Sequence, residues 1–396
     1  MIEALLKPEV QEFILQHQDA DPGLLMLQSK KYPGLPFREI VLQIQARQKA
    51  AQKIPEWYNH AGIFFPPPLS VEQSSSEVTA KYKAGLVSGT SFVDLTGGGG
   101  VDTFYLGRSF TEVHYVERNE HLCEVANHNF KVLGLSVNIH NESAEEFLNS
   151  DRENFDVIYI DPARRDAQSN KVFLLKDCEP DITKLLPDLL KKGRQALMKA
   201  SPMLDIHLVE DQLAPVKEIH IVAVANEVKE VLYFWENGWK GSSKIVAVNL
   251  NKDTGAVEDS FAFSRTEELE ASVNYTLPQK YLYEPNKSIL KAGAFKSLAL
   301  RLGLDKLHPN SHLYTSDKNI SFPGRVFEIM DVVPYQKKLI LKALPDRKAN
   351  ITTRNFPDTV ETIRKKTGIV DGGSIFLFAT TNRDGKLIVL VCKKVI

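Results

Sequence analysis

The chain has 396 residues, with 49 Lys and Arg against 50 Asp and Glu, and 43% of its residues are hydrophobic. This composition lies close to the average for globular proteins and excludes a disordered, collagen-like or coiled-coil chain, while the length predicts two or three domains. No apolar run approaches the about 18 residues of a membrane span, so we expect no membrane partner.

Neither the N-terminus nor the cysteines indicate an exported or metal-binding protein. Charges and a proline interrupt MIEALLKPEV where a secretory signal requires an apolar stretch, so we expect a cytoplasmic protein. The three cysteines lie far apart and form no CxxC pair, which argues against a disulfide framework and a zinc site. His308 and His312 are four residues apart, but Pro309 disrupts the helix that would aim both at one ion. We therefore expect no metal.

The net charge of −1 conceals an asymmetry along the chain. Residues 1–275 carry 28 basic and 40 acidic side chains, whereas residues 276–396 carry 21 basic and 10 acidic ones. Such a split predicts a basic module that meets a polyanion, joined to an acidic module with another task. A charged surface that docks on the acidic part of the same chain is an almost equal alternative.

Residues 1–69 are expected to form a helical N-terminal extension. Apolar residues recur at helical spacing up to about residue 60, as Ile40, Val41 and Ile44 do in FREIVLQIQARQKAAQK. The prolines of FFPPPLS then end the pattern, because proline cannot continue a helix. Ser70, with Gln73 three residues later, predicts the N-cap of a short helix.

Residues 70–275 are expected to form an α/β domain. Short β-rich runs alternate with helical stretches, which is typical of a parallel sheet covered on both faces. The runs are SFVDL (91–95), EVHYVE (112–117), SVNIHN (136–141), FDVIYID (155–161), RQALMKA (194–200), EIHIVAVA (218–225) and EVLYFW (230–235). Only NEVK separates the last two, so we expect them to be antiparallel. A further strand, KIVAVNL (244–250), completes or decorates the sheet.

The rest of the chain is expected to fold as a small α+β region. Residues 276–320 predict a compact unit with one helix from Ser288 to Arg301. Residues 321–396 predict strands near VFEIMDV, KANITTRN and SIFLFAT, a helix around DTVETIRKKTG, and a final strand LIVLVCKKV after a turn at residues 384–385.

The segment FVDLTGGGGVDTF (92–104) is the strongest local signal of a ligand site. Four glycines between a strand and a helix let the backbone approach a ligand without a Cβ, and the helix offers its first N–H groups. The loop lacks the G-x-G-x-x-G spacing of a pyrophosphate site, and the carboxylate of Asp94 favours a ligand with an ammonium group. A tight structural turn is the alternative.

Other polar residues end or follow neighbouring strands, and the carboxyl ends of parallel strands meet in one crevice. With the glycine loop, this arrangement resembles the class I S-adenosylmethionine-dependent methyltransferases, which have a Rossmann-like seven-stranded sheet. The resemblance implies S-adenosyl-L-methionine as the cofactor. The residues that it assigns are Asp94, Gly97 and Gly98 in the loop, Glu117 at the ribose, Ser143 at the adenine and Asp161 near the methyl group.

A longer resemblance connects the chain to bacterial methyltransferase-like proteins with a THUMP-like C-terminal domain. It rests on LPFREIVLQIQARQKAAQKIPEW, EQSSSEVTAKYKA, DLTGGGGVDT, IYIDPARR, KASPMLDI and ANEVKE, and downstream on LHPNSHLYTS, RNFP and DGG. It implies a ferredoxin-like unit over 276–320, a THUMP-like domain over 321–396, and tRNA or rRNA as the substrate. The basic balance of residues 276–396 points the same way.

The motif DPARR (161–165) differs from the motifs by which methyltransferases of known reaction type are recognised. Enzymes that methylate the amines of adenine or guanine commonly show D/N-P-P-Y/F/W, and here Ala163 and Arg164 replace the second proline and the aromatic residue. Uracil-C5 enzymes have DPPR but attack with a cysteine after the fifth strand, where this chain has Ser-Pro at 201–202, so C5 chemistry is disfavoured. We expect Asp161 and Arg164 to be catalytic, with the arginine holding a phosphate of the acceptor. A surface salt bridge is the alternative for the arginine.

Further residues are expected to contact RNA, namely Arg165, Lys199 and Asn226 near the crevice, and Arg354, Arg364, Lys365 and Lys366 in the basic region. Three functions remain open. The first is a class I methyltransferase that acts on RNA. The second is a non-catalytic RNA-binding or assembly protein that retains a cofactor pocket, which the divergent DPARR favours. The third is a small-molecule methyltransferase, against which the basic region argues.

Overall fold

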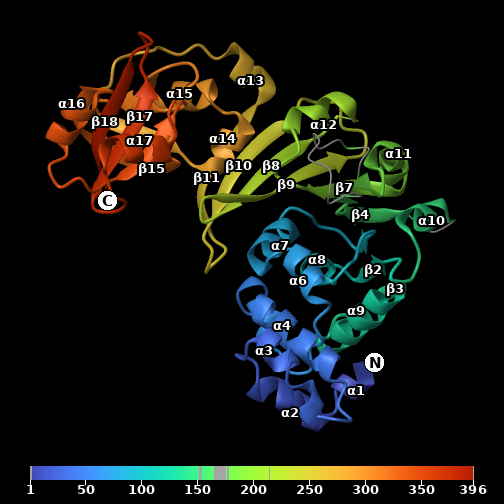
Figure 1. Ribbon diagram of the computed structural model, residues 1–396. Coiled ribbons are helices and arrows are strands. Elements are labelled where there is room, and N and C mark those ends of the chain that lie inside the picture. The colour runs from blue at the N-terminus through green and yellow to red at the C-terminus, as the bar shows by residue number, and fades with distance from the viewer. Residues whose placement is uncertain (1, 151–153, 165–174, 176–177, 214, 396) are drawn as a thin grey trace. The chain divides into compact units, whose positions relative to one another are not determined.

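The computed structural model describes residues 2–150, 154–164, 175, 178–213 and 215–395, and the chain divides into two units (Figure 1). Unit 1 contains Met1–Glu218, Glu230–Gly241 and Lys252–Gly255. Unit 2 contains Ile219–Lys229, Ser242–Asn251 and Ala256–Ile396. Among the helices in the described ranges, none is long and apolar enough to cross a membrane.

Helices form the first part of unit 1, as the periodicity predicted (blue in Figure 1). They are α1 (Ile2–Leu5), α2 (Pro8–Gln16), α3 (Pro22–Met26), the 3-10 helix η1 (Ser29–Lys31), α4 (Phe37–Lys53) and α5 (Pro55–Asn59). Their buried apolar side chains, Ile40 among them, pack in a cluster that includes Val125 of α9 (Glu120–Val132). The N-terminal helices therefore share a core with the α/β part of unit 1.

Two buried side-chain amides hold the segment FFPPP. Gln43 of α4 accepts the N–H of Phe65 at 3.0 Å and donates to its carbonyl at 2.7 Å. Asn129 of α9 does the same for Phe64, at 2.9 and 2.7 Å. These bonds satisfy an extended backbone that proline keeps out of any helix.

The predicted N-cap at Ser70 is wrong. Helix α6 (Pro68–Gln73) begins at Pro68, so Ser70 lies inside it, and no side chain caps this helix. Proline suits the first helical position because its missing N–H needs no partner there. The cap belongs instead to the next helix, α7 (Glu77–Ala84), where Ser76 accepts the N–H of Thr79 at 3.2 Å.

A sheet forms the centre of unit 1. Its parallel strands are β1 (Ser91–Asp94), β2 (Glu112–Val116), β3 (Asn138–His140), β4 (Phe155–Ile160) and β7 (Gly193–Ala200), and residues 231–236 of β9 (Glu227–Glu236) run antiparallel to β7. Their order is β9-β7-β4-β1-β2-β3. The associated helices are α8 (Val101–Gly107), α9, α10 (Ala144–Asn149), α11 (Ile182–Lys192) and α12 (Ile206–Gln212). The carboxyl ends of β1, β2, β4 and β7 therefore lie along one side of this sheet.

Two groups of strands form unit 2. The first has the order β11-β10-β8 and comprises β8 (Glu218–Val224), β10 (Lys244–Leu250) and β11 (Val257–Ser264), followed by α13 (Arg265–Glu270). The second is a seven-stranded sheet of order β13-β14-β12-β15-β18-β17-β16. Its strands are β12 (Tyr281–Pro285), β13 (Asp305–Lys306), β14 (Tyr314–Ser316), β15 (Gly324–Pro334), β16 (Asn350–Arg354), β17 (Ile375–Thr381) and β18 (Leu387–Lys394).

Residues 276–320 and 321–396 contribute to this one sheet, because β12 pairs with β15. The strands and helix predicted within 321–396 are confirmed, and α16 (Lys337–Ala343) accompanies the predicted helix α17 (Val360–Thr367). The single helix predicted from Ser288 to Arg301 is wrong. It is two helices, α14 (Lys287–Ala292) and α15 (Lys296–Leu302), because Gly293 ends the first with a φ of +79°. The predicted fold class is confirmed: an α/β sheet domain, a helical N-terminal extension and an α+β C-terminal region.

Candidate active site

The glycine loop after β1 is shaped by its own packing. A Cβ at Gly97 would lie 2.1 Å from the ring of Tyr115, so that position accepts only glycine. The Tyr115 hydroxyl donates to the carbonyl of Gly98 at 2.7 Å. Gly98 and Gly100 have φ values of +53° and +82°, which L side chains rarely adopt. Among the described residues, a Cβ at Gly98 would meet only the Thr96 carbonyl, at 3.7 Å.

Glu117 at the end of β2 contacts this loop. One carboxylate oxygen accepts the N–H of Gly98 at 3.0 Å, and the other accepts the N–H of Asn119 at 2.8 Å. The side chain is half-buried. The structure therefore brings together Glu117 and Gly98, two of the residues assigned from the sequence.

Asp94 ends β1 beneath the loop and is buried. Its carboxylate accepts the Thr103 hydroxyl at 2.6 Å and the N–H of Thr96 at 3.0 Å. Burial raises the pKa of Asp94 to about 7, and the charges of Asp102 and Asp161 also raise it, against the effect of these hydrogen bonds. Asp94 can therefore change its charge near neutral pH.

Asp161 follows β4 on the same side of the sheet. Its N–H donates to the Thr96 hydroxyl at 2.7 Å, which ties the start of DPARR to the glycine loop. Its carboxylate pairs with the ammonium of Lys199, near the end of β7. The backbone then forms the short strand β5 (Ala163–Arg164), which pairs with β6 (Cys178–Glu179). Arg165 lies outside the described residues.

Lys199 is mostly buried among acids, with 14% of its side chain exposed. Burial lowers its pKa, but the carboxylates of Asp161, Asp102 and Glu230 together raise it above its ordinary value. The ammonium therefore stays charged at neutral pH and cannot act as a general base.

A buried ion cluster lies beside this pair and was not predicted. Lys83 of α7 is fully buried and donates to both oxygens of Glu230 on β9, at 2.9 and 3.0 Å. It also lies 3.2 Å from Asp102 and donates to Ser75 at 2.8 Å. Asp102 accepts the hydroxyls of Ser75 and Tyr159 at 2.8 and 2.9 Å. The cluster joins the loop before α7 to α8, β4 and β9.

Ser143 has a structural role, as the N-cap residue of a helix. It is the N-cap of α10, where it accepts the N–H of Glu146 at 3.2 Å and donates to the carboxylate of Glu146 at 2.8 Å. The N–H of Ser143 donates to the same carboxylate at 2.9 Å, which completes a capping box.

Asn226 belongs to unit 2, in the turn between β8 and β9. Its φ is +61°, its N–H donates to the Asn249 side chain at 2.7 Å, and its own side-chain oxygen accepts the N–H of Lys287 at 2.7 Å. These bonds give it a role in the packing of unit 2.

Three of the four predicted RNA contacts in the basic region form ion pairs within unit 2. Arg354 donates to Glu284 at 3.0 Å, Arg364 pairs with Asp371, and Lys366 pairs with Asp358 at 2.6 Å. Lys365 is exposed, and no ion pair forms on it within the described ranges. In the same ranges, no group of three or more His, Cys, Asp or Glu is placed to hold a metal ion.

Comparisons with known proteins identify relatives of every part of the chain. Residues 47–177 match the family model described as conserved hypothetical protein 95, residues 281–323 match a ferredoxin-like domain, and residues 324–394 match a THUMP domain-like model. The family models thus divide the seven-stranded sheet between β12 and β15.

Two relatives match over most of their length. The crystal structure of a "putative methyltransferase" from Porphyromonas gingivalis W83 is 36% identical, with a TM-score of 0.88, over 100% of this chain and 98% of that one. An uncharacterized S-adenosylmethionine-dependent methyltransferase of Mycobacterium tuberculosis is 22% identical over 81% of this chain and 86% of its own length.

Proposed function

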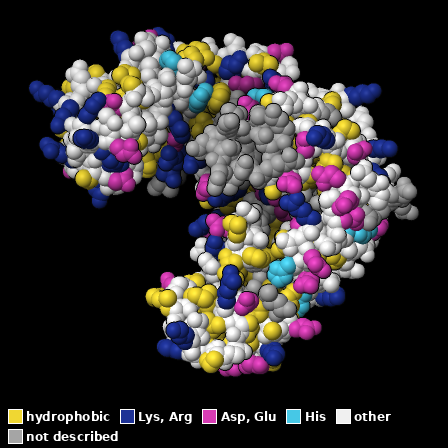
Figure 2. All heavy atoms as spheres, turned by 45° about the vertical axis from the view of Figure 1, so that its right-hand side comes forward, with side chains coloured by type: hydrophobic (Ala, Val, Ile, Leu, Met, Phe, Trp, Pro, Cys, Tyr) yellow, Lys and Arg dark blue, Asp and Glu magenta, His cyan; other side chains and the backbone are white. Residues whose placement is uncertain are grey.

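This chain belongs to the S-adenosylmethionine-dependent methyltransferases with ferredoxin-like and THUMP-like C-terminal domains, and we propose that it methylates tRNA or rRNA. The charge of residues 276–396, with 21 basic and 10 acidic side chains, carries the proposal. Among the charged side chains on the face of unit 2 that Figure 2 shows, Lys and Arg predominate over Asp and Glu. The phosphodiester backbone of RNA is a polyanion that such a basic region can bind.

The proposal keeps the domains expected from the sequence, which are residues 1–69, 70–275, 276–320 and 321–396. Residues 276–320 and 321–396 would present the RNA together, since β12 and β15 pair in one sheet. Lys365 is the predicted contact whose charge is not balanced by a neighbouring acid in the described ranges, so it is the first candidate for a phosphate contact.

The residues around the glycine loop fit S-adenosylmethionine, which supplies an electrophilic methyl group on a sulfonium sulfur. Among the described residues, little more than the Thr96 carbonyl lies near the position that a Cβ of Gly98 would take, which leaves room for a ligand, and Glu117 beside it can accept the two ribose hydroxyls. Asp94 and Gly97 support the loop from below. We leave Ser143 out of the proposed ligands, because its hydroxyl is already bonded to Glu146.

Asp161 is the proposed catalytic residue, next to the transferred methyl group. Lys199 balances its charge and cannot itself take a proton, so a proton that leaves the acceptor would go to Asp161. Arg164 would hold a phosphate of the acceptor and so align it with the methyl group. In this role Lys199 positions the carboxylate and does not contact RNA.

A second candidate is a small-molecule methyltransferase. The internal ion pairs of Arg354, Arg364 and Lys366 favour it, because a cation already paired with a carboxylate contributes less to RNA binding. A protein that binds RNA without catalysis is tested by the same experiment.

The test is methyl transfer from radiolabelled S-adenosylmethionine to total RNA of a strain that lacks the gene. We expect labelled RNA whose modified nucleoside is missing in that strain, and Arg164→Ala should raise KM for RNA more than it lowers kcat. Label that enters only small molecules would establish the second candidate. No label at all, with the cofactor still bound, would establish the non-catalytic protein.

A further inference from the structure

Two helices, α16 and α17, pack on one face of the seven-stranded sheet of unit 2 (Figure 1). Ile340 of α16 and Ile363 of α17 are buried in one apolar cluster. The same cluster contains Leu377 of β17 and Val391 of β18, which are paired. Each helix therefore buries one side and leaves the other side to solvent. The solvent sides of both helices, with the turn 345–348 that follows α16, form what we call the α16–α17 surface.

The α16–α17 surface carries more positive charge than its acids balance. Two of its cations, Arg364 and Lys366, are paired with carboxylates. Six others are exposed and form no ion pair within the described ranges, namely Lys337, Lys338, Lys342, Arg347, Lys348 and Lys365. Apart from the partner of Arg364, the acids of residues 337–348 and 360–374 are Asp346 and Glu361. The surface is therefore suited to a partner with many negative charges.

The arrangement of the lysines also favours bound anions. Lys338 and Lys342 lie four residues apart on α16, so they share one side of the helix and their charges repel each other. An anion that pairs with both ammonium groups removes this repulsion. Lys348 lies along the loop of the DGG motif, since a Cβ at Gly372 would be 3.2 Å from its Cε. Its side chain therefore loses little freedom when the ammonium pairs with a phosphate.

We propose that the α16–α17 surface binds the phosphates of a double-stranded stem in the RNA acceptor. Residues 337–348 and 360–374 contain no aromatic residue. Tyr335, just before α16, is already engaged, because its hydroxyl donates to Asp358 at 2.6 Å and its ring packs on Phe356. Unpaired bases bind mainly by stacking on aromatic side chains, whereas a duplex is bound through its phosphates and its shape. The inference rests on the proposed RNA acceptor and names the part of it that this surface would hold.

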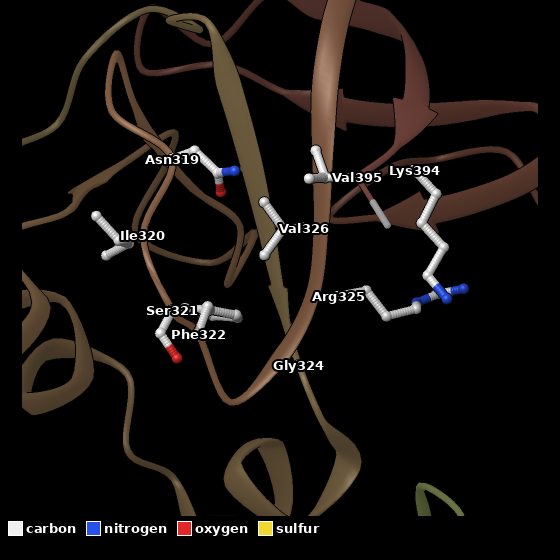
Figure 3. A pocket seen from close by; sticks show the side chains of 9 residues that line it. All are labelled: Asn319, Ile320, Ser321, Phe322, Gly324, Arg325, Val326, Lys394 and Val395. Carbon is white, nitrogen blue, oxygen red and sulfur yellow. The ribbon is translucent and has the colours of Figure 1, made fainter.

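A cleft of about 430 Å³ elsewhere in unit 2 is less suited to RNA (Figure 3). Its lining includes the cations Arg325 and Lys394 and the apolar side chains of Val326 and Val395. Successive residues of a strand point to opposite faces, so these cations and these apolar side chains do not face one ligand. Lys394 also points to the face of β18 opposite to Val391, away from α16 and α17. It therefore provides a control position outside the α16–α17 surface.

The experiment measures binding of the full chain to an RNA duplex of about 16 base pairs, a length that a duplex-binding domain can span, and to a uridine oligomer of the same length. Fluorescence anisotropy at several salt concentrations gives both affinities. We expect the duplex to bind at least tenfold more tightly. Lys338→Glu/Lys342→Glu should weaken duplex binding at least tenfold. Lys338→Gln/Lys342→Gln should reduce the slope of log affinity against log salt by about 2, because two phosphate contacts are lost.

The matched control is Lys318→Glu/Lys394→Glu, which changes the net charge by the same amount. Both lysines are exposed and form no ion pair among the described residues, and Lys318 follows β14, away from α16 and α17 in the strand order. The control should weaken duplex binding less than threefold. The proposal is overturned if the control and Lys338→Glu/Lys342→Glu have equal effects, or if the uridine oligomer binds as tightly as the duplex. Unchanged binding by Lys338→Glu/Lys342→Glu would also overturn it and leave the surface to dock on acids of the same chain.

Thermal unfolding followed by circular dichroism shows whether each variant is folded, and the glutamine variant decides the test if the glutamate variant is not. RNA methylation with unchanged kcat and KM in Lys338→Glu/Lys342→Glu would refute the role of the surface and leave the proposed function intact. Duplex binding that depends on Lys338 and Lys342, without methylation of any RNA, would refute the proposed function alone.

Discussion

The ammonium of Lys199 is paired with the carboxylate of Asp161 across the neighbouring strands β7 and β4. The lysine balances the charge of this acid, which is the first residue of DPARR and the proton acceptor that we propose. The proposed transfer of a proton to Asp161 therefore depends on the ammonium of Lys199.

Replacing Lys199 by Met should lower methyl transfer by about 100-fold or more, because it leaves Asp161 without its cation and without a fixed position. The measurement is the initial rate with RNA from the deletion strain, with S-adenosylmethionine affinity measured separately. Lys191→Met, on the exposed side of α11, is the control and should leave the rate unchanged. A Lys199→Met protein with normal activity would contradict the positioning role.

Replacing Glu117 by Ala should weaken S-adenosylmethionine binding by about 1.5–3 kcal/mol, the usual contribution of hydrogen bonds to a charged group. Titration calorimetry measures this loss directly. Glu120→Ala, an exposed acid in the first turn of α9, should change the affinity little. Equal affinities in the wild type and Glu117→Ala would show that the acid only supports the backbone of Gly98.

Replacing Lys83 by Met should lower the free energy of unfolding by about 3–5 kcal/mol, because it leaves the carboxylates of Glu230 and Asp102 without the buried ammonium that balances their charge. Lys81→Met on the same helix removes the ion pairs of an exposed lysine with Glu77 and Glu56 and should cost less than about 1 kcal/mol. Urea denaturation measures both. The double variant Lys83→Met/Glu230→Gln should recover part of the loss, and no recovery would refute the electrostatic explanation.

Asp94 should make stability depend on pH. Its pKa is raised in the folded state, so the folded protein binds a proton that the unfolded chain releases, and stability falls as pH rises from about 4 to 7. The slope is at most about 1.4 kcal/mol per pH unit, and it vanishes above the folded pKa. Denaturation of the wild type and Asp94→Asn at several pH values isolates the effect. A difference between them that is constant over this range would show that Asp94 stays charged.

Binding of the full chain to tRNA should weaken steeply with salt, because bound phosphates release counterions. Lys365→Ala should reduce the slope of log affinity against log salt by about 1. Lys366→Ala should reduce it less, since Asp358 already balances that charge. Binding that is insensitive to salt would leave the basic region as an internal docking surface.

The strands and the main contact of the glycine loop could be predicted because both follow from local pattern. Strand ends of a parallel sheet converge, so Glu117 and Gly98 were expected together, and they are. The need for glycine at position 97 was not predictable, because Gly97 makes room for the ring of Tyr115, which lies on the neighbouring strand β2. The number of glycines in such a loop therefore overstates how much of it faces a ligand.

The buried ion cluster could not be predicted. Lys83 and Glu230 are 147 residues apart, and a lysine within EVTAKYKA looks like an ordinary solvated helix face. Strand β11 was missed for a related reason, because only the second half of VEDSFAFS is buried in alternation. A single glycine is tolerated inside many helices, so Gly293 did not reveal the break between α14 and α15.

The pairing of β12 with β15 limits how the protein can be truncated. Leu282 lies opposite Phe327 across this pair, and both are fully buried in one cluster. A fragment that begins at residue 324, where the THUMP-like match starts, would lack β12 and would expose Phe327 together with an unpaired strand edge. Such a fragment is expected to aggregate, whereas one that begins near residue 276 retains the complete sheet.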